Sequence, residues 1–203
     1  MKKIFMLAAG LFLAGAVHAQ SPIRFGIKGG LNLSNIIKEN GNNNFDTKIN
    51  PGFNVGVTVD IPLSESIAFT PEALYSTKGY KLTSGFGEYT QTTSFIDIPI
   101  LASIKLAGTG LNVVVGPQVS FLTSTKNKFK NDLGTIENEV NNNSDNLKKS
   151  LFGGVLGLRY DINQNIDFHA RYALDFQKNN ENGTTSTPEY KNQVISLGFG
   201  YKF

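Results

Sequence analysis

Apolar residues recur at every second position through most of this chain, in eight separate stretches that are each about ten residues long. A period of two predicts β-strands, because successive side chains of a strand point to opposite faces of the sheet. No stretch after Gln20 shows the 3.6-residue period of an amphipathic helix. We therefore expect an all-β protein. The predicted strands cover residues 23–33, 53–61, 67–76, 96–106, 111–121, 152–162, 166–176 and 194–203.

The two faces of these predicted strands differ in charge. In the first stretch Phe25, Ile27 and Leu31 occupy one face, and Arg24 and Lys28 occupy the other. Over all eight stretches the first face carries no charged residue, so it must contact something that excludes water. The second face carries six basic and six acidic residues: Arg24, Lys28, Lys105, Arg159, Arg171 and Lys202, with Asp60, Glu72, Asp97, Asp161, Asp167 and Asp175.

The connections between the stretches decide which face is outside. Short connections (62–66, 107–110 and 163–165) alternate with long polar ones, which are residues 34–51, 77–94, 122–150 and 178–193. Short periplasmic turns alternating with long extracellular loops are typical of bacterial outer-membrane barrels. A sheet in lipid must also close on itself to satisfy every backbone group. We expect an eight-stranded antiparallel up-and-down transmembrane β-barrel, with its uncharged face toward lipid and both termini in the periplasm.

The first nineteen residues form a predicted signal peptide, which leaves residues 20–203 as the barrel domain. Lys2 and Lys3 precede an uncharged apolar stretch (4–17), and Val17-His18-Ala19 has the small residues of a cleavage site. The apolar stretch is shorter than the roughly 20 residues of a membrane-spanning helix. Removing Lys2 and Lys3 lowers the formal net charge from +3 to +1. A clustered basic excess is then lacking, so we expect no nucleic-acid partner.

Aromatic residues end the chain on the uncharged face. Phe199, Tyr201 and Phe203 alternate with Gly200 and Lys202. We interpret them as a C-terminal insertion signal, because an amphipathic edge strand can be captured by strand addition to the barrel insertion machinery. The alternative is an ordinary last strand whose final aromatic residues belong to the interfacial girdle.

Four short motifs, in this order along the chain, carry a family resemblance. They are Phe25-Gly26-Ile27-Lys28-Gly29-Gly30-Leu31-Asn32-Leu33-Ser34, Ile96-Asp97-Ile98-Pro99-Ile100-Leu101, Gly116-Pro117-Gln118-Val119 and Phe152-Gly153-Gly154-Val155-Leu156-Gly157. Together they resemble the PorT-like family of small outer-membrane barrels. The resemblance implies an eight-stranded barrel in the outer membrane of a Gram-negative bacterium. Most members have no assigned activity, and the name-giving member is associated with protein secretion by the type IX system. No site residue is carried over from the family.

The charged face is expected to fill the barrel interior. An eight-stranded barrel is just wide enough for side chains to fill it, and a buried charge without a partner is costly. Because the two signs balance, we predict a network of salt bridges that closes the lumen. The alternative is a narrow porin-like channel in which these charges line a path for small solutes. The predicted lumen network comprises Arg24, Lys28, Asp60, Glu72, Asp97, Lys105, Arg159, Asp161, Asp167, His169, Arg171, Asp175 and Lys202.

Enzymatic chemistry would have to use His169, the only histidine beyond the signal peptide. Asp167 and Arg171 lie on the same face of its strand, but neighbours at this spacing do not define a catalytic site. We expect no enzyme activity, no cofactor and no metal, since the chain has no Cys and its carboxylates are scattered. The expected partners are outer-membrane lipid and lipopolysaccharide, the insertion machinery and proteins of a secretion complex. The lysine-rich connection 122–150 is either a solvated, mobile loop or a segment that contacts lipopolysaccharide or a partner protein.

Overall fold

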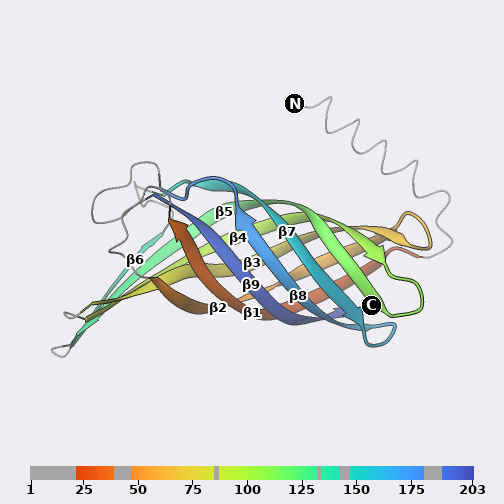
Figure 1. The fold of residues 1–203 in the computed structure, drawn as a ribbon, viewed down its shortest axis with the longest axis horizontal. Helices are drawn as coiled ribbons and strands as arrows, with labels where there is room; N and C mark the ends of the chain where they lie inside the picture. Colours follow the sequence, from red (N-terminus) through yellow and green to blue (C-terminus); the bar gives the residue numbers. More distant parts are fainter. Residues whose placement is uncertain (1–21, 39–46, 85–86, 132–133, 142–146, 181–188) are drawn as a thin grey trace, which may run out of the picture.

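The computed structural model describes residues 22–38, 47–84, 87–131, 134–141, 147–180 and 189–203. The predicted signal peptide lies outside these residues. The described chain forms nine antiparallel strands (Figure 1). Among the described residues, no helix is long and apolar enough to cross a membrane. The strands are β1 (Arg24–Lys38), β2 (Thr47–Pro62), β3 (Ile67–Ser84), β4 (Gly87–Lys105), β5 (Leu111–Asn131), β6 (Gly134–Asn141), β7 (Ser150–Asp161), β8 (Ile166–Asp175) and β9 (Tyr190–Lys202).

Eight of these strands close into a ring. Each strand from β1 to β5 pairs with the next, β5 pairs with β7, and β7, β8 and β9 follow in order. The ring closes between β1 and β9, in a register that runs from Gly26 opposite Lys202 to Lys38 opposite Tyr190. The predicted all-β, antiparallel up-and-down barrel is therefore confirmed. Among the described strands, β6 pairs with the distal part of β5 alone, so it stands outside the ring.

The two ends of the barrel are built differently. The tight connections after β2, β4 and β7 lie at one end, which we call the turn end. The last residue of the chain is also there (Figure 1), and its amide donates a hydrogen bond of 2.8 Å from Phe203 to the carbonyl of Phe25. The opposite end, where the strands extend furthest, is called the loop end.

Much of the sequence that we predicted to be loop is paired strand. β3 and β4 continue through residues 77–94 and are joined across residues 85–86, and the connection 122–150 contains the distal part of β5 and all of β6. The prediction was wrong here because it relied on an apolar face. Where the outer face of a hairpin is no longer in lipid, backbone pairing continues although the two-residue apolar alternation stops.

The uncharged face points away from the ring axis, as expected of a lipid-facing surface. Leu31 is 67% exposed and Phe25 is 62% exposed, whereas the intervening Lys28 is buried inside the ring. Aromatic side chains mark both ends of this surface. Tyr201 packs edge-on against Phe203 near the turn end, and Phe53 packs against Tyr75 toward the loop end. These pairs lie where aromatic belts of a membrane barrel are expected.

Candidate functional site

The barrel interior contains buried charged side chains of both signs. Five basic and five acidic side chains are buried among the described residues, so the two signs balance. They lie at three levels between the turn end and the loop end. The buried charged residues are Lys28, Lys78, Arg159, Arg171 and Lys202, with Asp60, Glu72, Asp97, Asp167 and Asp175.

The middle level is organised around Glu72 on β3, whose side chain is fully buried. Lys28 on β1 donates to one carboxylate oxygen at 2.8 Å. Arg171 on β8 donates to both oxygens, at 2.7 and 2.9 Å. Glycines face the two long side chains across the strands, with Gly200 opposite Lys28 and Gly157 opposite Arg171. One carboxylate thereby links three strands of the ring through charge-assisted hydrogen bonds.

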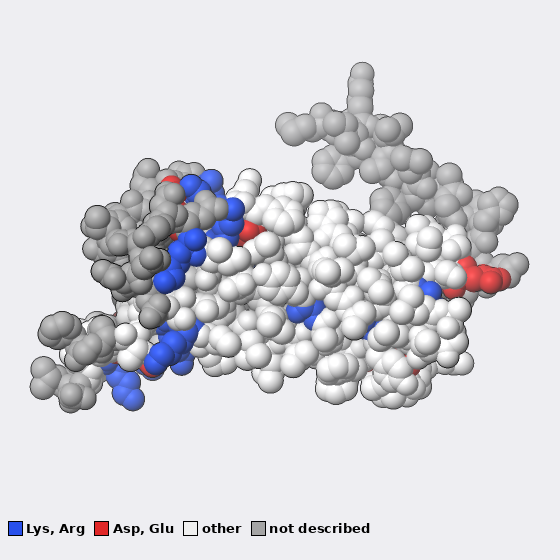
Figure 2. Space-filling view, viewed as in Figure 1, with Lys and Arg blue, Asp and Glu red and all other residues white. Residues whose placement is uncertain are grey.

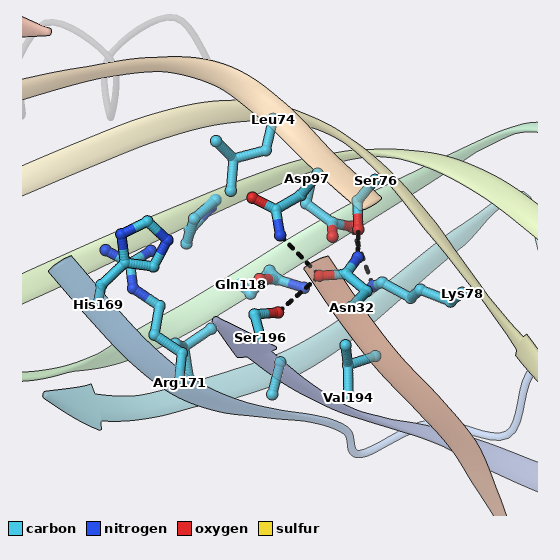
Figure 3. Close-up of a pocket in the computed structure, with 14 residues that line it drawn as sticks. Asn32, Leu74, Ser76, Lys78, Asp97, Gln118, His169, Arg171, Val194 and Ser196 are labelled. Atoms are coloured by element: carbon cyan, nitrogen blue, oxygen red, sulfur yellow. Dashed lines mark hydrogen bonds and ion pairs between the residues drawn. The ribbon is translucent and has the colours of Figure 1, made fainter. Parts of the chain in front are cut away.

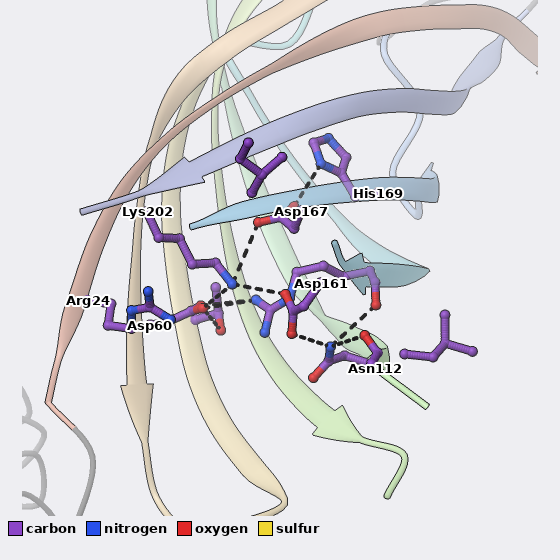
Figure 4. Close-up of polar contacts among 12 residues, drawn as sticks. Arg24, Asp60, Asn112, Asp161, Asp167, His169 and Lys202 are labelled. Carbon is purple, nitrogen blue, oxygen red and sulfur yellow. Dashed lines mark hydrogen bonds and ion pairs between the residues drawn. The ribbon is translucent and has the colours of Figure 1, made fainter. Parts of the chain in front are cut away.

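The level near the turn end joins five charged groups (Figure 4). Asp60 contacts Arg159 at 3.1 Å and Lys202 at 3.0 Å. Lys202 also lies 3.2 Å from Asp161 and 3.6 Å from Asp167. Each cation therefore has more than one carboxylate partner, which offsets part of its desolvation cost.

The level toward the loop end centres on Lys78 of β3. Its ammonium donates to Asp97 and to Ser120, both at 3.0 Å, and lies 3.9 Å from Asp175. It also lies 4.8 Å from the centre of the Phe95 ring. Sequence reasoning missed Lys78 because the residue falls just beyond the last apolar position of its stretch. Its spacing of two residues from Ser76, on the lumen face, was the available signal.

Neutral polar side chains line the lumen beside Lys78 and Arg171 (Figure 3). Asn32 donates to the hydroxyl of Ser76 at 3.0 Å. Its carbonyl oxygen accepts from Asn54 at 2.6 Å and from Ser196 at 2.7 Å. These residues come from β9, β1, β2 and β3, which are consecutive in the ring, so the hydrogen bonds join side chains along one part of its inner wall.

A small cavity remains in the centre of the barrel, with a volume of about 30 Å³. Lys78, Asp97, His169 and Arg171 are among the residues that line it. A cavity of this size with polar walls accommodates a water molecule or two, since one water needs roughly 10–15 Å³ measured in this way. The cavity is too small for a nutrient-sized solute.

His169 lies beside this cavity and is only 1% exposed. Its Nδ1 is 3.5 Å from an oxygen of Asp167, which is long for a hydrogen bond. No group of three or more metal-ligating side chains occurs in the part of the chain that the structure describes. The geometry therefore supplies a buried histidine beside a carboxylate.

Two residues of the predicted network do not join it. Lys105 is exposed at the turn end. Arg24 is only partly buried, and its guanidinium donates to the carbonyl oxygen of Gln164 in the turn after β7. Both occupy the predicted face of their strands, but they lie at the rim of the ring, where water solvates them.

A cluster of tyrosines covers the lumen at the loop end. Tyr80 and Tyr190 are each 1% exposed and meet edge-on, with 5.5 Å between ring centres. The hydroxyl of Tyr190 donates to Gln91 at 2.7 Å and accepts from Asn179 at 3.1 Å. We call Tyr80, Gln91, Asn179 and Tyr190 the lid. Burial raises the pKa of the Tyr190 hydroxyl well above its usual range, and the neighbouring Tyr80 adds to the shift.

Comparisons with known proteins agree with this architecture. Residues 18–181 match the family model of the outer membrane protein beta-barrel domain. No curated protein matches the sequence. Among solved structures, the attachment invasion locus protein Ail of Yersinia pestis, solved with the heparin analogue sucrose octasulfate, aligns with a TM-score of 0.52 at 14% identity, over 90% of this chain and 100% of Ail. Neisserial surface protein A aligns with a TM-score of 0.51 at 12% identity, over 90% of this chain and 100% of that protein.

The fold and the filled lumen define a small outer-membrane β-barrel. The chain belongs to the outer membrane protein beta-barrel domain family, and its surroundings are accordingly outer-membrane lipid and lipopolysaccharide. The match does not single out the PorT-like members of the family. At these identities the likeness to Ail and to Neisserial surface protein A concerns the fold alone.

Proposed function

We propose that this chain is a closed, non-catalytic outer-membrane barrel that serves as a structural or interaction component of the envelope. In this proposal the loop end lies outside the cell, and the turn end with both termini lies in the periplasm. The orientation follows the rule that short turns of such barrels face the periplasm and long hairpins face outward.

The observation that carries the proposal is the filling of the lumen. Three levels of ion pairs, the hydrogen bonds of Asn32 and the lid follow one another along the axis. Apolar side chains close part of the remaining space, because Leu101, Val114 and Val155 form a buried cluster inside the ring. A solute would have to break several buried ion pairs to pass, and each broken pair leaves an uncompensated charge.

The non-catalytic part of the proposal rests on the surroundings of His169. A general base must come within hydrogen-bond reach of the proton that it removes. His169 is buried beside a cavity of about 30 Å³, so no substrate larger than water reaches it without rearrangement of the lumen.

Contact with lipopolysaccharide is supported by the distribution of lysines. Figure 2 shows blue side chains gathered at the loop end, while the middle of the visible surface is almost uncharged. Lysines near a membrane surface attract anionic head groups. The exposed lysines at this end include Lys48, Lys126, Lys128, Lys130 and Lys149.

A place in a secretion complex of the type IX kind rests on the PorT-like resemblance, and chemical cross-linking in the native outer membrane tests it. The protein is then extracted in mild detergent and the attached proteins are identified. A stoichiometric partner supports an interaction component, and a secretion protein among the partners supports the narrower role. Recovery of the barrel alone, after cross-linking that captures a known envelope complex in the same sample, counts against both.

The second candidate function is a narrow channel for small solutes. The specific observation in its favour is the polar cavity lined by Lys78, Asp97 and Arg171, which a rearranged lid would connect to the outside. Conductance of the purified protein separates the two functions.

A further inference from the structure

β6 brings an unpaired strand edge to the surface at the loop end. One edge of β6 pairs with β5 from Ser124 opposite Asn141 to Asn131 opposite Gly134. Within the described ranges, no strand pairs with its other edge. Figure 1 shows β6 beside the distal part of β5, beyond the region where the ring closes. A strand edge of this kind exposes a row of backbone donors and acceptors that another strand can use.

One face of this hairpin sheet carries an apolar row that stops at the edge. Leu82 is opposite Tyr89, Tyr89 is opposite Phe129, and Phe129 is opposite Ile136. The row begins at the buried lid region, where Leu82 and Tyr89 pack against Tyr80 and its neighbours. It ends at Ile136, which is 72% exposed. An apolar side chain on an added strand would cover Ile136 and continue the row.

The opposite face carries a charged row that stops at the same edge. Lys128 of β5 is opposite Glu137 of β6, and Lys126 is opposite Glu139. Lys126 also forms an ion pair with Glu137. Lys128 and Phe129 of β5 therefore complement Glu137 and Ile136 of β6. Among the described strands, none places a cation beside the other edge of β6.

We propose that the free edge of β6 binds an extended segment of a partner protein in which basic and apolar residues alternate. The segment adds a strand to the sheet, its apolar residue covers Ile136, and a neighbouring basic residue faces Glu137. A second copy of this chain is a poorer occupant in each antiparallel register of large overlap. Full overlap of two β6 strands sets Ile136 opposite Glu139, and a slip of one residue in either direction sets Glu137 opposite Glu137 or Glu139, where like charges are destabilising. The inference rests on the proposed interaction role and names the kind of partner.

The test uses the full-length protein in lipid nanodiscs and a peptide with the sequence of Ser124–Asn131, blocked at both ends. This peptide reproduces the strand that already complements β6. We expect saturable binding, with slower amide hydrogen exchange along Gly134–Asn141. A peptide whose three lysines are replaced by glutamate should not bind. Glu137→Lys should weaken binding by about tenfold, the size expected from loss of a close charge pair in a complex.

Glu88→Lys is the matched control. Glu88 lies opposite Lys130, on the same face as Glu137, but on the interior strand β4. The same change of charge there should leave peptide affinity within about twofold, a difference far below the tenfold effect of one lost pair. Equal weakening by both substitutions would show attraction to surface charge only and would overturn the edge site.

Two further outcomes separate this inference from the proposed role. No peptide binding, together with a stoichiometric partner cross-linked elsewhere on the barrel, overturns the edge site and leaves the interaction role in place. Protection of β6 by the peptide supports the edge site whatever the cross-linking shows. Failure of cross-linking to capture any partner in the membrane counts against the proposed interaction role. Concentration-dependent dimerisation through β6 would identify a second copy as the occupant and overturn the proposed partner chemistry.

Discussion

Arg171 donates two hydrogen bonds to the carboxylate of Glu72, from a position 99 residues further along the chain. Lys28 contacts the same carboxylate from a third strand. The lumen is therefore filled in part by contacts between strands that are far apart in sequence. Such a buried network stabilises the barrel only as a complete set, because losing one partner leaves the others charged and desolvated.

Glu72→Gln should destabilise the barrel strongly. The substitution leaves Lys28 and Arg171 facing a neutral amide inside the lumen, and breaking a buried pair in this way costs about 3–5 kcal/mol. Urea-induced unfolding in phospholipid vesicles, followed by circular dichroism, measures the effect. Lys105→Gln is the control, because this exposed side chain should change the free energy of unfolding by no more than about 0.5 kcal/mol. Equal effects of the two substitutions would contradict the network.

Lys78 and Asp97 should be energetically coupled. Their charged atoms lie 3.0 Å apart in the buried lumen, so removing either one leaves the other without its closest partner. We expect Lys78→Met and Asp97→Asn each to be destabilising, and the double variant to be less destabilised than the sum, by about 0.5–3 kcal/mol. A double-mutant cycle from unfolding measurements gives this difference. Additive effects would mean that the pair contributes no interaction energy.

Gly56 and Gly29 should respond differently to alanine. A Cβ at Gly56 would lie 2.8 Å from the Cα of Leu74 and would overlap the carbonyl oxygen of Ala73. At Gly29, on the lipid-facing side, the nearest atom would be 3.5 Å away, an ordinary contact. Gly56→Ala should cost about 1–3 kcal/mol, as overpacking does, whereas Gly29→Ala should be close to neutral. A smaller loss of stability for Gly56→Ala than for Gly29→Ala would contradict the close packing of β2 against β3.

The lid should loosen at alkaline pH. Burial raises the pKa of Tyr80 and of Tyr190, so the folded lid holds both protons more tightly than the unfolded chain does. The stabilisation is complete below the ordinary tyrosine pKa of about 10 and is lost as the pH rises above it. Amide hydrogen exchange at the start of β9 should accelerate above that pH. With both tyrosines changed to phenylalanine, the acceleration should be much smaller, and an unchanged pH dependence would assign it to other groups.

The barrel itself could be predicted from sequence because lipid imposes a strict pattern. Every position of the predicted strands on the lipid-facing side had to be uncharged, and the ring places residues such as Phe25 and Leu31 on that side. The same alternation predicted that Lys28 and Glu72 lie on the inner face of their strands. The contact between Lys28 and Glu72 could not be predicted in this way. The two residues are 44 positions apart, and their contact depends on how far neighbouring strands are staggered in the closed ring.

Position along the barrel axis was harder to predict than the face of the strand. Arg24 and Lys105 have the predicted parity but lie at the rim, where they need no buried partner. The prediction missed Lys78, Tyr80 and β6 because they lie beyond the stretches with an apolar outer face. They lie where the outer face of the sheet has left lipid, so its residues are polar while backbone pairing continues. Backbone pairing between polar strand segments produces no clear hydropathy pattern in the sequence.

The closed lumen is the central claim, and single-channel recording tests it most directly. Purified protein is reconstituted into planar lipid bilayers, with insertion of the folded barrel verified by its heat-modifiable mobility on gels. The ion pairs around Glu72, Asp60 and Lys78 predict no reproducible open level in the wild-type protein. Stable, discrete current steps that scale with the amount of inserted protein would contradict the account and favour the channel.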